Sequence, residues 1–191
     1  ANLQGVFEAV RKIRRRSEAP LVLFTYLNPL LTPSFEKNMA SAKAAGVDGV
    51  LTLDLPVEEN ASCIRSLYRH HLDNISLVTP TSPDERIRRI VKYATGFVYC
   101  VSREGVTGMQ TTLAPSAAKL LRRTRALTPL PVALGFGIST PEQARAAARQ
   151  ADAVVVGSAI VDRFNQEGPS RAGRARAAAW VKTLISAVKR L

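Results

Sequence analysis

Short apolar runs alternate with amphipathic segments along the whole chain. The runs are four to six residues long and do not alternate strictly with polar residues, which is typical of parallel strands covered on both faces. The expected strands are Leu21–Tyr26, Gly49–Asp54, Ser76–Thr79, Phe97–Ser102, Val132–Phe136 and Ala153–Gly157. Between them, apolar residues recur at helical spacing. The expected helices are Asn2–Arg16, Phe35–Ala45, Glu58–His71, Asp84–Tyr93, Pro115–Leu127, Thr140–Gln150 and Ser170–Lys189.

Local signals mark several of these helix ends. Gly46 follows Ala45 and predicts a C-terminal stop, while Thr140 before Pro141 predicts a capped start. Glu58 and Glu59 are expected in a first helical turn, where acids complement the helix dipole.

Strands that alternate with helices predict an α/β fold with a parallel sheet, as an open doubly wound sheet or a (β/α)8 barrel. A barrel typically has eight units and about 250 residues. This chain of 191 residues shows six strands and opens on a helix. A TIM barrel would therefore be partial here, with its first two strands missing. No linker interrupts the pattern, so residues 1–191 are expected to form one domain.

The net charge of +12 raises the question of polyanionic partners. The basic residues are scattered over the expected outer faces of helices, and no aromatic residues are interleaved among them for base stacking. We therefore favour solvated helix faces over nucleic-acid binding. No apolar run is long enough to span a membrane, and no secretory signal opens the chain.

Cys63 and Cys100 lie far apart and form no CxxC pair, which favours buried thiols in a reducing, cytoplasmic compartment. His70 and His71 are adjacent, and adjacent helical residues do not face the same way. No metal site is therefore expected.

The chemistry is expected where strands end, because functional groups of βα proteins gather there. The sequence SREGVTG, Ser102 to Gly108, opens a long polar loop that has the character of a lid. GFGIST and GSAI follow the last two strands and bring Gly137, Gly157 and Ser158 to helix starts. Unpaired N–H groups at such positions bind phosphate. The pairing of the two glycine motifs predicts a phosphate site.

Taken in order, the motifs YLNPLL, GVDGVLTLDLPVEE, SREGVTG, GFGIST and VVGSAIV resemble the alpha subunit of tryptophan synthase over essentially the whole chain. The resemblance implies a (β/α)8 barrel. It also implies a lyase of tryptophan biosynthesis that cleaves indole-3-glycerol phosphate to indole and glyceraldehyde 3-phosphate. Such a subunit holds no cofactor of its own and works in an alpha2beta2 assembly, where the beta subunit carries pyridoxal phosphate.

The resemblance also implies roles for individual residues. The residues expected to bind the substrate phosphate are Gly108, Gly137, Gly157 and Ser158. Those expected in or near the indole pocket are Tyr26, Tyr99 and Phe136. Those expected to meet the beta subunit are Asn28, Pro29, Asp54 and Pro56. Thr107 would belong to the lid, where the family uses this threonine to orient a catalytic aspartate.

The sequence departs from the family at the catalytic carboxylates. The family carries a glutamate and an aspartate in a segment similar to ELGxPFSDPxADGP, which would lie before Ala1 and is absent from these residues. No catalytic residue is therefore expected among residues 1–191, and the chain alone is expected to be inactive. Asp54 matches neither carboxylate and is not expected to replace them.

Two other functions stay open at this point. One is a noncatalytic module that keeps the phosphate site and modulates a beta subunit. The other is a phosphate-binding barrel enzyme of indole or thiamine biosynthesis, against which the motifs DLPVEE and SREGVTG argue.

Overall fold

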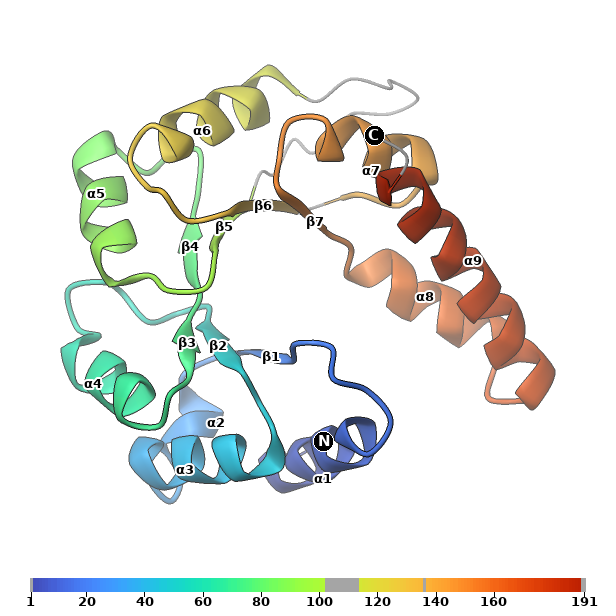
Figure 1. Cartoon of the computed structure of the whole chain (residues 1–191), viewed down its shortest axis with the longest axis horizontal. Coiled ribbons are helices and arrows are strands. Elements are labelled where there is room, and N and C mark those ends of the chain that lie inside the picture. The colour runs from blue at the N-terminus through green and yellow to red at the C-terminus, as the bar shows by residue number, and fades with distance from the viewer. Residues whose placement is uncertain (1, 102–113, 136, 190–191) are drawn as a thin grey trace. The chain divides into compact units, whose positions relative to one another are not determined.

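The computed structural model describes residues 2–101, 114–135 and 137–189. Figure 1 shows its helices and strands along the chain. The chain divides into two compact units. The first comprises Ala1–Leu77 and Arg88–Val98, and the second comprises Val78–Ile87 and Tyr99–Leu191. That the chain forms a single domain stays a prediction.

The first unit is built around a parallel sheet in the order β1-β2-β3. Its elements are α1 (Leu3–Arg14), β1 (Val22–Thr25), α2 (Asn28–Leu31), α3 (Phe35–Ala45), β2 (Gly49–Thr52), α4 (Ala61–Arg69) and β3 (Asp73–Asn74). Val22 pairs with Gly49, and Gly49 pairs with Asp73. Phe7, Met39 and Val50 are fully buried in one apolar cluster, which joins α1 and α3 to the sheet.

A second sheet has the order β4-β5-β6-β7. Its strands are β4 (Ser76–Val78), β5 (Val98–Val101), β6 (Val132–Gly135) and β7 (Ala153–Val155). The accompanying helices are α5 (Asp84–Tyr93), α6 (Pro115–Arg125), α7 (Pro141–Ala148), α8 (Ser158–Glu167) and α9 (Arg171–Lys189). Strands β6 and β7 are parallel, and Leu134 pairs with Val154. Figure 1 shows α9 lying along both α7 and α8.

The six expected strands and seven expected helices are confirmed. Helices α3 and α5 have the expected bounds, and the other elements are shorter within the described residues. One expectation is wrong: α4 begins at Ala61, after a turn from Pro56 to Glu59, so Glu58 and Glu59 precede the helix rather than forming its first turn. Proline lacks the N–H and restricts its neighbour, which favours a turn there. Glu58 instead forms an ion pair with Arg89 at 3.4 Å.

The ends of α3 and α4 are built alike. Gly46 follows α3 with φ of +101°, and the N–H of Val47 then donates to the carbonyl of Ala42. His71 follows α4 with φ of +53°, and the N–H of Leu72 donates to the carbonyl of Leu67. Both ends thus use a left-handed residue to satisfy helix carbonyls. At His71 this residue is not glycine, so the backbone is strained there.

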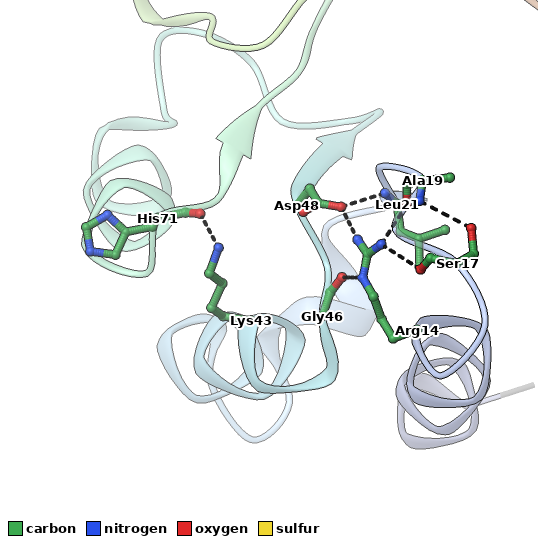
Figure 2. Close-up of polar contacts among 8 residues, drawn as sticks. All are labelled: Arg14, Ser17, Ala19, Leu21, Lys43, Gly46, Asp48 and His71. Atoms are coloured by element: carbon green, nitrogen blue, oxygen red, sulfur yellow. Dashed lines mark hydrogen bonds and ion pairs between the residues drawn. The ribbon is translucent and has the colours of Figure 1, made fainter.

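A polar clamp holds the amino ends of β1 and β2 (Figure 2). The Arg14 side chain forms an ion pair with Asp48 and donates to the carbonyls of Gly46 at 2.8 Å and Ala19 at 2.7 Å. The N–H of Leu21 donates to the same Asp48 carboxylate at 2.7 Å. Because Arg14 ends α1 and Asp48 precedes β2, the clamp ties a helix to two neighbouring strands.

The second unit repeats this clamp. Arg125 ends α6 and forms an ion pair with Asp152 at 2.7 Å. The N–H of Val132 donates to the Asp152 carboxylate at 2.8 Å. In both clamps the arginine lies in the last turn of a helix, and the aspartate immediately precedes the second of two paired strands. One local design therefore fixes both pairs of strands at their amino ends.

Candidate functional site

The loops after β6 and β7 line one cavity of about 310 Å³, the β6–β7 pocket. Gly137 and Ser139 enter it from the β6–α7 loop, and Ser158 enters it from the start of α8. Gly157 is the N-cap residue of α8 and adjoins Ser158. Of the four expected phosphate residues, the structure therefore brings Gly137 and Ser158 together and places Gly157 beside them. Gly108 lies outside the described residues.

Local sequence holds the β6–α7 loop in place. Gly137 has φ of +73°, a conformation that favours glycine, and no atom lies within 4 Å of the position that a β-carbon would take. The Gln143 side chain accepts from the N–H groups of Ser139 at 2.9 Å and Thr140 at 3.2 Å, while the N–H of Gln143 donates to the Thr140 hydroxyl. This capping box fixes the loop to the first turn of α7.

The start of α8 suits an anion. No side chain forms a cap hydrogen bond at Gly157, and the first turn of the helix holds no acidic residue. The N–H groups of a first helical turn have no partner within the helix, and the helix dipole is positive there. The N–H of Ile160 donates to the carbonyl of Gly157 at 2.9 Å, so a phosphate oxygen would meet the N–H groups that precede it, at Ser158 and Ala159.

The pocket is also lined by residues from the middle of two helices. These residues do not lie at strand ends and were not among the expected site residues. Asp162, Arg163 and Gln166 line it from α8, and Trp180 lines it from α9. The Arg163 guanidinium forms an ion pair with Glu167 at 2.9 Å and lies 5.9 Å from the centre of the Trp180 ring. The helical spacing of Ser158, Asp162 and Gln166 is the signal that places these residues on one face.

The expected indole residues have different surroundings. Tyr99 lies on β5 with only 7% of its surface exposed, and desolvation by burial raises the pKa of its phenol. Its ring lies against Gly135, the last residue of β6. Tyr26 follows β1 in the other unit and is 60% exposed. Phe136 and the expected lid residue Thr107 lie outside the described residues.

The expected partner-contact residues gather at one place in the first unit. Asn28, Pro29, Asp54 and Pro56 are all exposed. The Asp54 carboxylate accepts a hydrogen bond from the N–H of Leu27 at 2.6 Å, and the N–H of Leu53 donates to the carbonyl of Thr25 at 2.9 Å. These bonds join the chain after β1 to the chain after β2. Asn28 and Pro29 begin α2, while Asp54 and Pro56 lie in the loop after β2, so the four residues form an exposed rim where these two bridged segments meet.

The cysteines are buried free thiols, as expected. Desolvation raises the pKa of Cys63, and it raises that of Cys100 to about 11, so both stay protonated at neutral pH. The described part of the chain contains no group of three or more His, Cys, Asp or Glu side chains that could hold a metal ion. Nor does any helix in that part have the length and apolar character needed to cross a membrane.

Comparison with known proteins assigns the chain to one protein family. Residues 1–189 match the family model described as tryptophan synthase alpha chain. The chain is 49% identical over 170 residues to the tryptophan synthase alpha chain of Solibacter usitatus, which covers 89% of this chain and 64% of that protein. It is 46% identical over 187 residues to that of Opitutus terrae, with 97% and 70% covered. The chain thus spans about two thirds of the length of these relatives.

Solved structures agree with the sequence comparison. A chain of the tryptophan synthase complex from Pyrococcus furiosus superposes with a TM-score of 0.86 at 35% identity, which covers 97% of this chain and 74% of that one. A structure of the a2b2 complex from the same organism gives a TM-score of 0.85 at 34% identity, with the same coverage. These neighbours are TIM barrels, which confirms the expected fold class; the strands described here are arranged in two sheets and do not close into a barrel.

Proposed function

Because this chain belongs to the tryptophan synthase alpha chain family, we propose that it binds indole-3-glycerol phosphate and serves its cleavage to indole and glyceraldehyde 3-phosphate. The observation that carries this proposal is the β6–β7 pocket, in which Gly137 and Ser158 from two successive strand ends line one cavity. Barrel enzymes commonly hold a substrate phosphate between the loops after their last two strands.

The phosphate end of the substrate would lie at the start of α8. Backbone donors at Gly137 and Ser158 fit the oxygens of a phosphate ester, and the helix dipole complements its charge. The indole end would lie toward Tyr99, a buried aromatic side chain on β5. Packing of the indole ring against an aromatic side chain would stabilise the bound substrate in a site that excludes water.

The cleavage needs a group that protonates the indole ring carbon and a group that removes a proton from the glycerol hydroxyl. Asp162 is the only carboxylate among the described residues that line the pocket, and it is solvent-exposed. Asp54 is exposed and bonded to the Leu27 N–H in the other unit. Neither suits a general acid, so we propose that these 191 residues do not complete the reaction by themselves. The alpha reaction would then draw its glutamate and aspartate from a segment not included here.

We further propose that the rim of Asn28, Pro29, Asp54 and Pro56 contacts a beta chain that carries pyridoxal phosphate, in an alpha2beta2 assembly in the cytoplasm. Support comes from the exposure of all four residues and from the hydrogen bond that joins the chain before α2 to the loop after β2. The alpha subunit itself would need no cofactor. A structural relative is an a2b2 complex of tryptophan synthase.

The proposal can be tested with the 191-residue chain and a purified beta chain of this family. Calorimetric titration with indole-3-glycerol phosphate should show saturable binding, and competition with glycerol 3-phosphate should weaken it. Indole release should stay at the background rate for the chain alone. If the chain binds no phosphate ester, the proposed function is wrong. If it releases indole at an enzymatic rate, only the proposal that these residues are insufficient is wrong.

A second measurement separates the lyase subunit from a noncatalytic modulator. The chain would be supplemented with a peptide of the family's glutamate- and aspartate-bearing segment, in the presence of the beta chain. Indole release above background supports the lyase role. Stimulation of the beta chain without any indole release would favour the modulator.

A further inference from the structure

The β6–β7 pocket contains one cationic side chain among the described residues that line it, that of Arg163 on α8. This position lies five residues beyond Ser158, on the helix face that borders the cavity. A phosphate ester brings up to two negative charges into the pocket. Backbone N–H groups carry only partial charge, so the binding free energy of the ester should depend on the nearest full positive charge.

Contacts from two helices fix the Arg163 side chain. Its Nη2 atom lies 2.9 Å from the Glu167 carboxylate, one turn further along α8. Its guanidinium lies 5.9 Å from the centre of the Trp180 ring on α9. A guanidinium that is held on one edge and packed against an aromatic face loses little conformational entropy when it meets an anion.

The ion pair with Glu167 does not cancel this charge. Glu167 also accepts from the Arg176 Nε atom at 2.6 Å, so one carboxylate is shared between two guanidinium groups. The cluster of these three side chains therefore keeps one net positive charge. In addition, the Arg163 Nε atom is buried, and no described residue accepts a hydrogen bond from it. An unsatisfied buried donor is costly unless a ligand or water meets it.

We propose that Arg163 is a positioning residue that binds and orients the phosphate end of the substrate in the β6–β7 pocket. The inference rests on the proposed function, because it assumes that Gly137 and Ser158 hold a phosphate ester. Arg163 supplies the full charge that the backbone donors lack. The neighbouring Asp162, which lines the same pocket, opposes it and limits how tightly an anion is held.

The test is the dissociation constant of the full 191-residue chain for inorganic phosphate and for glycerol 3-phosphate. Arg163→Gln should weaken binding by about three- to tenfold, as expected for a partly exposed charge near an anion. Arg163→Lys keeps the charge and should lose less. Asp162→Asn should tighten binding by about two- to threefold. Arg174→Gln is the matched control, because Arg174 lies on α9 outside the pocket and donates to the carbonyl of Pro169 instead of pairing with Glu167, so affinity should change by less than about twofold.

A further variant tests the phosphate site itself. Ser158→Pro removes a backbone N–H at the first helical position, where proline is tolerated. It should weaken phosphate binding regardless of Arg163. If Ser158→Pro weakens binding and Arg163→Gln matches the unsubstituted chain, the role of Arg163 is wrong while the proposed site stands. If the unsubstituted chain binds neither probe, or if Ser158→Pro has no effect, both proposals fail.

Folding and salt dependence complete the test. Thermal unfolding of each variant shows whether a change in affinity follows a change in stability. If Arg163→Gln does not fold, Arg163→Met replaces it, because methionine keeps an unbranched side chain against Trp180. Neutralising Arg163 should also make the dissociation constant less sensitive to ionic strength. An unchanged salt dependence together with a weakened affinity would indicate a packing role and would contradict the proposal.

Discussion

The ring of Tyr99 fills the space beside Gly135 in which any other residue would place its β-carbon. A β-carbon on Gly135 would overlap the Tyr99 hydroxyl and would lie 2.7 Å from its Cε2 atom. Tyr99 is on β5 and Gly135 is on β6, and these two strands are neighbours in the second sheet. The two positions are therefore coupled by size.

We expect Gly135→Ala to lower the free energy of unfolding by about 1–3 kcal/mol, because an overpacked site forces the buried ring or the backbone to move. Tyr99→Leu should relieve the overlap, so the double variant should be more stable than the two single effects predict. A double-mutant cycle by urea unfolding measures this coupling. Additive effects would show that the two side chains do not compete for space.

His71 offers a stabilising substitution. Its φ of +53° destabilises the folded state by about 1–2 kcal/mol for a residue with a β-carbon. The backbone carbonyl of His71 accepts a hydrogen bond from the Lys43 ammonium, and this bond does not depend on the His71 side chain. His71→Gly should raise the free energy of unfolding by about 0.5–1 kcal/mol after the greater entropy of unfolded glycine is included. Urea unfolding of both chains measures this change in the free energy of unfolding.

Gly46→Ala is the matched opposite change. It places a β-carbon at φ of +101° and 2.6 Å from the Arg14 side chain, and should destabilise. If both substitutions shift stability in the same direction, the left-handed backbone is not the cause.

Asp152 should make stability depend on acid pH. The backbone N–H of Val132, and after it the Arg125 charge, hold the pKa of this carboxyl below its usual value. Because the folded pKa is lowered, the stabilisation is complete above the unfolded value of about 4 and is lost as the pH falls through the folded pKa. Asp152→Asn should reduce the loss of stability between about pH 4 and pH 2, measured by urea unfolding at each pH.

Arg125→Gln separates the two contributions at Asp152. It keeps the bond from Val132, which is the larger cause of the lowered pKa, so most of the acid dependence should remain. If Arg125→Gln removes the acid dependence as completely as Asp152→Asn, the ion pair and not the backbone bond is responsible.

Gly173 sets how closely α9 approaches the end of α8. A β-carbon there would overlap the carbonyl oxygen of Glu167 and would lie 2.9 Å from that of Gly168. Helix propensity alone favours alanine over glycine by about 1 kcal/mol. We nevertheless expect Gly173→Ala to destabilise by about 1–3 kcal/mol, because backbone atoms cannot give way as a side chain can. Thermal unfolding decides the sign, and a gain in stability would contradict the close approach.

Asp54 tests the proposed partner rim. Asp54→Ala removes the 2.6 Å bond to the Leu27 N–H and should free the chain after β1 from the chain after β2. Affinity for a beta chain should fall by about tenfold, since truncating a residue that orders an interface loop commonly costs about 1 kcal/mol or more. Asp54→Asn keeps an acceptor and should lose less. Equal affinities for all three chains would remove Asp54 from the interface.

Much of the fold could be predicted because its signals are local. Ser34 caps α3, Gly46 ends it, and Thr140 with Gln143 caps α7. The elements that sequence reasoning missed are short or weakly marked. Helix α2 has four residues and β3 has two, and both depend on tertiary contacts more than on periodicity. Helix α8 has no acid in its first turn and no fully buried residue, so its apolar pattern is faint.

The site residues that follow strands could be predicted from the sequence, whereas those in the middle of helices could not. Gly137, Gly157 and Ser158 follow strands directly, so the topology alone places them at one edge. Arg163 and Trp180 reach the same pocket from the middle of α8 and α9. Their position depends on how two helices cross, which Gly173 sets through a contact of backbone with backbone. The spacing of residues in the sequence does not indicate how the two helices cross.

The paired clamps bear on how the chain could be divided. Arg14, Leu21 and Asp48 lie within one continuous stretch, as do Arg125, Val132 and Asp152. A break in the backbone between Asp48 and Arg125 severs neither clamp. Each piece would keep the contacts that set the register of its own strand pair. We therefore expect the chain to be suited to fragment complementation, with the break placed after β2 and before α6, so that each strand pair stays with its own clamp.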